Sequence, residues 1–363
     1  MWAIALKEFR QVRRDHRLVA LMVVMPVVML VVFGYAASFD VSQVRTVVTG
    51  PQAERVAAQL PAPLEVTGVR PGDGREAARQ ALVDGEAMIA VVTGGPADRP
   101  LVLIDGSQLF AARAAQTALA QGAAGGAAQG VPQPQVEVLF NPGLDTSTVM
   151  VPGLMGVVLV FVGTVITSLG VVRERQAGTL EQLTVMPFKP RDVIAGKVAP
   201  YFLVAIFDMT LIVVAGLLLF GVPFNGSPLL FALAAAMFLL VTLGVGVLIS
   251  TVSQNQGQAV MLALMTMLPQ ILLSGLIFPV EAMAAGVRWI AYLLPLKYFI
   301  DVSRGVLLRG AGFGALWLPL TMLAVLGVLV FGLAIARFRR DLAPKAAGEP
   351  ARPEPALAQA GAR

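Results

Sequence analysis

The chain has 363 residues, of which 57% are hydrophobic and 13% are charged, and its formal net charge is +5. Its mean hydropathy is +0.77. This composition excludes a soluble globular protein, because the few polar side chains could not solvate the surface. The absence of cysteine excludes disulfides, thiolate metal sites and cysteine nucleophiles, and the single histidine, His16, lacks the partners that a histidine-based metal or catalytic site needs. We therefore expect a membrane protein that binds no metal.

The N-terminal region combines a basic arm with a long apolar run. Residues 1–17 place Trp2, Leu6 and Phe9 on one face of a helix, which predicts an amphipathic helix on the cytoplasmic surface. A basic arm that only sets topology is an equal alternative. Residues 18–37 are long enough to cross the hydrocarbon core and too long for a signal-peptide core, so we expect a retained first span.

A polar segment, 38–147, follows the first span and is expected to fold on its own outside the cytoplasm. Runs typical of strands alternate in it with runs typical of helices, which predicts a small α/β domain. The expected strands are 44–48, 64–69, 88–93, 101–104 and 136–140, and the expected helices are 53–60, 74–83 and 109–121. Gly, Ala, Gln and Pro fill residues 122–135, which predicts a flexible loop.

Five further charge-poor segments are long enough to span a membrane. They are 149–172, 198–220, 227–252, 259–280 and 315–336. The segment 281–314 holds only a short apolar stretch with Pro295 and Lys297, so we expect re-entrant or interfacial helices there. The tail, 337–363, is expected to be cytoplasmic and largely disordered. The predicted fold class is thus an α-helical polytopic membrane protein with six transmembrane helices, re-entrant helices and a small α/β extracytoplasmic domain.

Between the second and third spans lies a charged insert, 173–197. Gly178 permits a sharp turn, Thr179 has the capping-box spacing to Gln182, and Pro187 ends the short helix that this cap begins. A short amphipathic helix held between two spans is suited to docking a soluble partner.

Asp208 falls near the middle of the third predicted span, where a carboxylate costs on the order of 2.5 to 3.5 kcal/mol on insertion scales. Such a residue is expected to face protein or water. It could line a translocation pathway or form a polar tie between spans, and the sequence does not decide between them.

Lysine and arginine are concentrated in three segments that an even number of predicted spans separates, and which therefore lie on one side of the membrane: the N-terminal arm, the charged insert and the tail. The positive-inside rule places these three in the cytoplasm, with both termini. No enzyme is indicated, because Gly196-Lys197 lacks the upstream glycine of a P-loop and no HExxH or GxSxG motif occurs. Energy for any transport must therefore come from a source other than ATP bound to this chain.

These motifs together resemble a known family. The string RERQAGTLEQL at 173–183, followed by Pro187, Gly196-Lys197 and Pro200, closely resembles the signature of ABC-2 type transporter permeases. The strings LSGLIFP at 273–279 and LPLKYFIDVSRG at 294–305 resemble it as well, and the order of segments is similar to the subgroup with a large extracytoplasmic domain after the first span.

The resemblance implies an integral inner-membrane subunit of a bacterial exporter that works as a dimer, with ATP and Mg²⁺ on a separate cytoplasmic ATPase and no cofactor on this chain. Drugs, lipids or other amphipathic molecules are the implied substrates, and a periplasmic adaptor is a possible partner. The residues implied to couple to the ATPase are Glu174, Gly178, Thr179, Leu180, Glu181, Leu183, Pro187, Gly196 and Lys197.

Two other functions remain open at this stage. A signalling or mechanotransmission protein would report from the external domain to an ATPase without moving a substrate. A secondary transporter would need no ATPase and more charge within its spans than Asp208.

Overall fold

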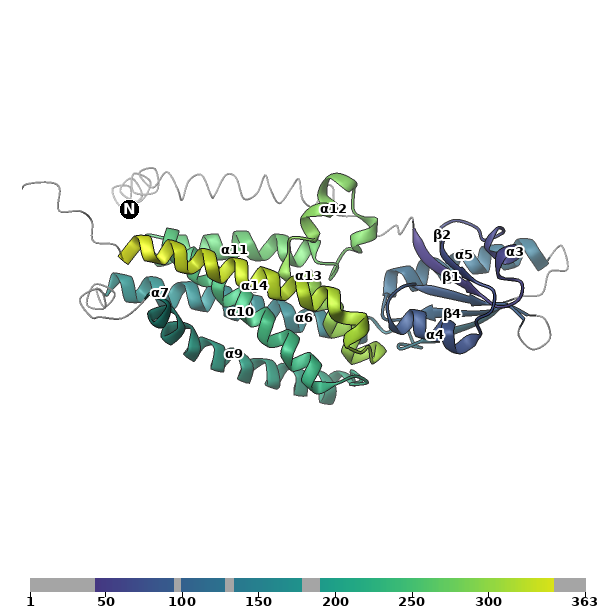
Figure 1. Cartoon of the computed structure of the whole chain (residues 1–363), viewed down its shortest axis with the longest axis horizontal. Helices are drawn as coiled ribbons and strands as arrows, with labels where there is room; N and C mark the ends of the chain where they lie inside the picture. Colours follow the sequence, from purple (N-terminus) through teal and green to yellow (C-terminus); the bar gives the residue numbers. More distant parts are fainter. Residues whose placement is uncertain (1–42, 95–98, 128–133, 178–189, 343–363) are drawn as a thin grey trace, which may run out of the picture.

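The computed structural model describes residues 43–94, 99–127, 134–177 and 190–342. These residues form an α/β domain, here called the sheet domain, and a helical bundle that extends from one side of it (Figure 1). The first predicted span, 18–37, and the amphipathic segment 1–17 lie outside the described residues, as does the tail beyond residue 342.

The strands of the sheet domain carry apolar residues on both faces of the sheet, and helices cover these two faces. Its elements in chain order are β1 (Val44–Thr49), α3 (Ala53–Ala57), β2 (Leu64–Arg70), α4 (Arg75–Val83), β3 (Ile89–Val92), β4 (Leu101–Asp105), α5 (Leu109–Ala127) and β5 (Gln135–Leu139). The strand order is β2-β1-β3-β4-β5, and only β3 and β4 pair antiparallel. Val44 and Val48 pack toward α3 and α5, whereas Val47 packs toward α4. The sheet is therefore covered on both faces, as expected for mostly parallel strands.

The bundle contains five helices that are long and apolar enough to cross a membrane, among the residues described. The first is continuous through α6 (Thr146–Val160), the π-helical η2 (Phe161–Ile166) and α7 (Thr167–Gln176). The others are α9 (Pro190–Phe220), α10 (Pro228–Val252), α11 (Gln256–Leu273) and α14 (Phe313–Leu342). The chain is thus a polytopic helical membrane protein.

Short helices connect α11 to α14. They are η3 (Val280–Ala282), α12 (Ala285–Ala291), α13 (Pro295–Arg304) and the π-helical η4 (Gly305–Arg309). Helix α13 lies inside the bundle, because its Phe299 is fully buried and stacks on Phe238 of α10 with ring centroids 4.5 Å apart. The segment predicted to be re-entrant thus contributes to the core.

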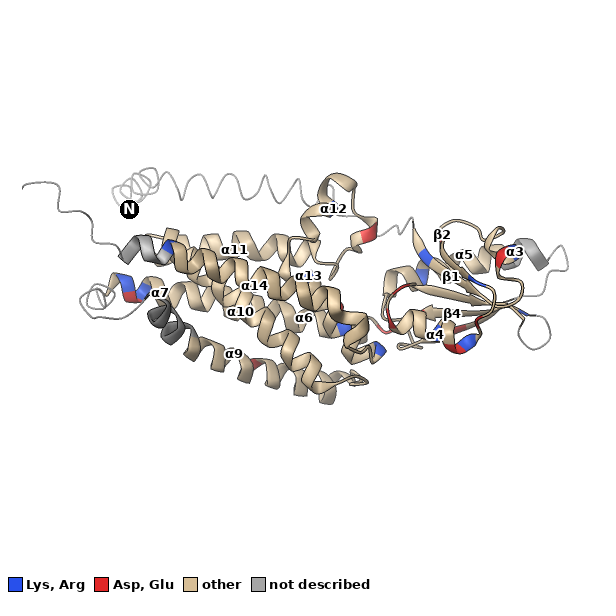
Figure 2. Ribbon diagram, in the orientation of Figure 1, with Lys and Arg blue, Asp and Glu red and all other residues tan. Residues whose placement is uncertain are grey.

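Charged residues are rare in the middle of the bundle, where Asp208 of α9 is an exception. Figure 2 shows lysine, arginine, aspartate and glutamate mainly on the sheet domain and at the two ends of the helices. The end of α7 lies at the opposite end of the bundle from the sheet domain (Figure 1). This distribution follows from the cost of placing charges in hydrocarbon.

Several predicted boundaries are wrong. The fifth span was predicted over 259–280, but α11 ends at Leu273, because Gly275 adopts a left-handed conformation with φ of +86°. The loop predicted from 122 is helical up to Ala127, since alanine favours the helix. The helix predicted over 53–60 ends at Ala57, shortly before Pro61.

Three further boundaries differ for a common reason. Helix α7 continues to Gln176, α9 begins at Pro190 and α14 continues to Leu342, although 173–197 was predicted as a loop and 337–363 as a tail. Hydropathy marks where a helix meets hydrocarbon, whereas its hydrogen bonds can continue beyond that border.

Glycines let the first described span approach α10 closely. A Cβ atom on Gly246 would lie 2.7 Å from the carbonyl oxygen of Gly163, and one on Gly163 would lie 2.2 Å from Thr242 Oγ1. These helices thus pack backbone to backbone through small residues, as membrane helices commonly do.

Replacing Gly246 by valine should destabilise this contact, because the obstructing atom is backbone and cannot rotate away. We expect a loss of about 1–3 kcal/mol, seen as a lower Tm of the detergent-solubilised protein. Gly332→Ala on α14 is the matched control, since no atom lies within 4 Å of the added methyl group. Equal Tm values for the two variants would contradict this packing.

Candidate functional site

The sheet domain meets the bundle through a buried ion pair. Asp105 ends β4 with 1% of its surface exposed, and its Oδ2 lies 3.7 Å from Nη1 of Arg309 in η4. The other carboxylate oxygen accepts a hydrogen bond of 2.9 Å from the Ser107 amide. The two parts of the chain are thus joined by opposite charges shielded from water.

Contacts between segments far apart in the sequence hold both partners of this pair in place. After β4, Gly106 approaches the backbone so closely that a Cβ atom would lie 2.8 Å from the Asn141 carbonyl oxygen. The Asn141 amide donates to the carbonyl oxygens of Gly106 and Asp145, which ties β4 to the start of α6. On the other side, the side-chain amide of Asn225 donates a hydrogen bond of 2.7 Å to the carbonyl oxygen of Leu308, which anchors η4.

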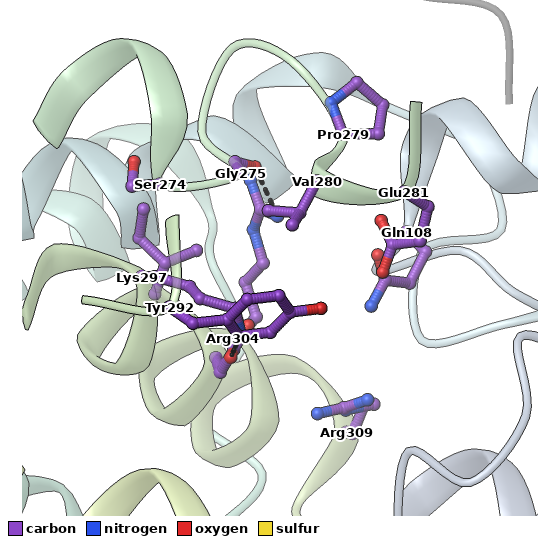
Figure 3. Close-up of a pocket in the computed structure, with 12 residues that line it drawn as sticks. Gln108, Ser274, Gly275, Pro279, Val280, Glu281, Tyr292, Lys297, Arg304 and Arg309 are labelled. Carbon is purple, nitrogen blue, oxygen red and sulfur yellow. Dashed lines mark hydrogen bonds and ion pairs between the residues drawn. The ribbon is translucent and has the colours of Figure 1, made fainter. Parts of the chain in front are cut away.

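A polar pocket of about 80 Å³ lies beside this junction (Figure 3). Three cationic and two acidic side chains line it, and all five come from the short helices between α11 and α14. They are Lys297, Arg304, Arg309, Glu281 and Asp301. Gln108 from the sheet domain completes one wall.

The cations of the pocket have different partners. Lys297 Nζ donates to Asp301 Oδ2 at 2.7 Å and lies about 5 Å from the ring centres of Tyr292 and Tyr298. Arg304 instead donates to two carbonyl oxygens, of Val149 and Gly275, each at 3.3 Å. No carboxylate of the described residues lies within ion-pair distance of Arg304.

Burial shifts the titration of this junction. Desolvation raises the pKa of the Asp105 carboxyl above its ordinary 3.8, although Arg309 opposes the shift. Desolvation lowers the pKa of the Arg304 guanidinium to about 10, so Arg304 remains charged at neutral pH.

The opposite end of the bundle holds the start of the predicted ATPase-coupling region. Glu174 lies in the last turns of α7. Its neighbour Arg175 donates to the Ser253 carbonyl oxygen at 3.2 Å, and the Gln176 and Gln256 side chains are hydrogen-bonded at 3.0 Å. The end of α7 is thus held to the turn between α10 and α11.

Most of the predicted coupling residues cannot be placed. Gly178, Thr179, Leu180, Glu181, Leu183 and Pro187 lie outside the described residues. Gly196 and Lys197 lie in the first turns of α9, on a helix rather than in the predicted loop.

Asp208 lies on α9 and is half-buried. The structure records no hydrogen bond or ion pair for its side chain within the described part of the chain. Its position next to buried Ala205 and Met209 puts it at the edge of the face that α9 turns toward the bundle.

Sequence analysis missed the junction pocket. Its signal was present: 281–314 carries four basic residues, although the positive-inside rule disfavours them on the side predicted for this segment. The structure brings three of these, Lys297, Arg304 and Arg309, to one pocket. Among the described residues, no group of three or more His, Cys, Asp or Glu could hold a metal ion.

Comparison with known proteins supplies the family. The family model described as "ABC-2 family transporter protein" matches residues 16–336. The chain is 28% identical to the "Probable multidrug ABC transporter permease YbhS" of Escherichia coli K12, over 94% of this chain and 97% of the relative. It is 33% identical to YbhR of the same organism, also named a probable multidrug ABC transporter permease, over 59% of this chain and 60% of the relative. It is 32% identical to the "Inner membrane transport permease YhhJ" of that strain, over 57% and 56%.

Removal of the Arg309 charge should lower the stability of the protein, because the buried Asp105 carboxylate would lose its partner. Arg309→Met leaves Asp105 without its cation, which should lower the stability at pH 7 by about 3 kcal/mol. The raised pKa of Asp105 implies stability that is present below its ordinary pKa of 3.8 and lost as the pH rises through the raised value. The Tm deficit of Arg309→Met should therefore be larger at pH 7 than at pH 4.

The double variant Asp105→Asn/Arg309→Met is the control, because it removes both charges. Its Tm should recover most of the deficit at pH 7 and lose the excess pH dependence. A double variant as unstable as Arg309→Met would show that the pair contributes through packing rather than charge.

Proposed function

This chain belongs to the ABC-2 family of transporter proteins, and we propose that it forms the pathway through which an ATP-driven exporter moves drugs, lipids or other amphipathic molecules. It is a permease subunit of an ABC transporter, a multi-pass inner-membrane protein whose partner is a cytoplasmic ATPase subunit. The observation that carries the proposal is the family match, which begins before the sheet domain and ends in the last candidate span.

We propose that the sheet domain lies outside the cytoplasm and that both termini lie inside. The basic insert 173–197 supports this orientation, because α7 carries its first residues to the end of the bundle away from the sheet domain (Figure 1). With a first span over 18–37 and the five described helices, the chain would cross the membrane six times.

In this proposal the coupling element is the segment from Glu174 to Lys197. The hydrogen bonds of Arg175 to Ser253 and of Gln176 to Gln256 support it, since they connect the base of the element to α10 and α11. A displacement of the element by an ATPase would therefore act on three helices together.

The rest of the assembly follows from the same proposal. Two permease copies, identical or related, would associate with two ATPase subunits, which bind ATP and Mg²⁺, while this chain binds no cofactor. The outward apolar faces of α9 and α14 offer surface for lipid and for the second copy. The sheet domain would contact a periplasmic adaptor where one is used.

Vectorial transport in reconstituted vesicles tests the proposal. The chain and its ATPase, placed in inverted vesicles, should accumulate a fluorescent amphipathic dye when ATP is added, and an ATPase unable to hydrolyse ATP is the control. Substrate-stimulated hydrolysis without accumulation of any tested dye or lipid would favour mechanotransmission instead. Dye accumulation driven by an ion gradient without ATP would favour a secondary transporter.

Charge reversal in the coupling element should separate hydrolysis from transport. Glu181→Lys or Leu183→Asp should lower ATP-dependent transport about ten-fold, while basal hydrolysis and membrane insertion persist. Lys345→Glu in the tail is a matched charge reversal on the same side of the membrane and should have little effect. Normal transport by both coupling variants would remove the docking role from this segment.

Asp208→Asn tests whether the carboxylate serves the pathway or assembly. Because this side chain has no recorded partner within the described chain, the Tm of the isolated permease should change little. Transport should fall about ten-fold if the charge faces the pathway, whereas a tie to a second copy would instead weaken copurification of two differently tagged permeases. Unchanged transport and assembly would rule out both roles.

A further inference from the structure

We propose that the polar pocket at the junction of the sheet domain and the bundle binds a single phosphate group, either free in solution or on the headgroup of a lipid. The pocket lies between Gln108 and the segment that runs from Glu281 to Arg309 (Figure 3). This binding does not depend on the proposed export.

One cation of the pocket has no ion-pair partner among the described residues. Lys297 is paired with Asp301 at 2.7 Å and Arg309 with Asp105 at 3.7 Å, whereas Arg304 forms no ion pair. Arg304 donates to the carbonyl oxygens of Val149 and Gly275, which carry no formal charge. A buried guanidinium is normally paired with an anion, because an uncompensated charge is costly to bury. An anion in the pocket would supply that compensation.

Arg309 has hydrogen-bonding capacity left over. Its side chain is 9% exposed, and its Nε is buried without a hydrogen-bond partner among the described residues. The 3.7 Å separation from Asp105 exceeds hydrogen-bond distance, so the ion pair does not saturate the guanidinium. The planar guanidinium matches the geometry of phosphate oxygens, which accept two parallel N–H bonds.

The other polar side chains line the same pocket. Figure 3 shows the side chains of Gln108, Lys297, Arg304 and Arg309 around one space, from the sheet domain, α13 and η4. Its volume of about 80 Å³ is well below the roughly 300–1,000 Å³ of pockets for drug-sized ligands. One phosphate group fits this space, whereas a drug-sized molecule does not.

Glu281 provides a sensitive test, because its negative charge should repel a phosphate group in the pocket. Its carboxylate lines the pocket, and no partner is recorded for that carboxylate within the described residues. Glu281→Gln removes this repulsion at nearly constant size. The variant should therefore bind phosphate more tightly, and a gain of affinity cannot arise from misfolding.

The experiment measures binding to the purified full-length chain in an uncharged detergent at constant ionic strength. Calorimetric titration with inorganic phosphate, and native mass spectrometry with dihexanoyl phosphatidic acid, probe the two sources. Dihexanoylglycerol is the comparator, because it has the same acyl chains without the phosphate. Preference for the phosphatidic acid without binding of inorganic phosphate would identify a lipid headgroup, and binding of both would identify a site open to free phosphate.

The variants locate the binding in the pocket. Glu281→Gln should tighten it roughly two- to five-fold. Asp105→Asn/Arg309→Gln removes the cation together with its buried partner and should weaken binding about ten-fold or more. Arg113→Gln on α5 removes an exposed positive charge outside the pocket and should leave the affinity unchanged.

Either of two results would overturn the proposal. One is the absence of preferential binding for both inorganic phosphate and the phosphatidic acid. The other is binding that Glu281→Gln fails to strengthen and the double variant fails to weaken, since it would then occur elsewhere on the protein.

Discussion

Hydrocarbon cannot hydrogen-bond to a peptide group, and the rest of this structure depends on that constraint. Every crossing segment described is a helix, because a helix satisfies its backbone groups internally. The same constraint keeps most formal charges at the two ends of the bundle (Figure 2). The polar chemistry is consequently divided between two places, the junction with the sheet domain and the opposite end at α7.

Within the bundle, association relies on close packing, since lipid tails are as apolar as the side chains. Gly163 and Gly246 bring two backbones into contact, and a ring stack joins Phe238 to Phe299. Buried hydroxyls add hydrogen bonds between helices, such as that which Ser303 of α13 donates to the Pro152 carbonyl oxygen of α6 at 3.3 Å. The connecting helix α13 thereby becomes part of the core although it is too short to span a membrane.

The architecture was predictable from sequence where one periodicity dominates. The strands of the sheet domain lie within one or two residues of their predicted bounds, because alternating β-branched residues between turns carry a strong local signal. Helix ends were predicted less well. The end of α11 depends on Gly275, whose positive φ cannot be distinguished in sequence from that of an ordinary packing glycine.

The junction pocket was not predictable for a different reason. Asp105 and Arg309 are more than 200 residues apart, and their pairing requires the sheet domain to lie on the bundle. Lys297 stood out in the sequence as a charge in an apolar stretch, and its i,i+4 spacing to Asp301 was a signal for the ion pair that sequence analysis did not use. The sequence places four basic residues in 281–314, and only the tertiary contacts show that three of them line one pocket.

One continuous helix connects the two polar places. The span from Thr146 to Gln176 covers 31 residues, or about 46 Å at 1.5 Å per residue. Near its first end Val149 accepts from Arg304 of the pocket, and near its last end Arg175 donates to Ser253. Between them lies the π-helical η2, where Gly163 contacts α10.

A π-helical turn widens the hydrogen-bond ladder and often marks a place where a helix can change its register. In the proposed exporter, force applied at α7 would be shared with α10 and α11, to which its last turn is hydrogen-bonded, and would reach the pocket along this continuous helix. The external pocket and the coupling element would then be two ends of a single mechanical part.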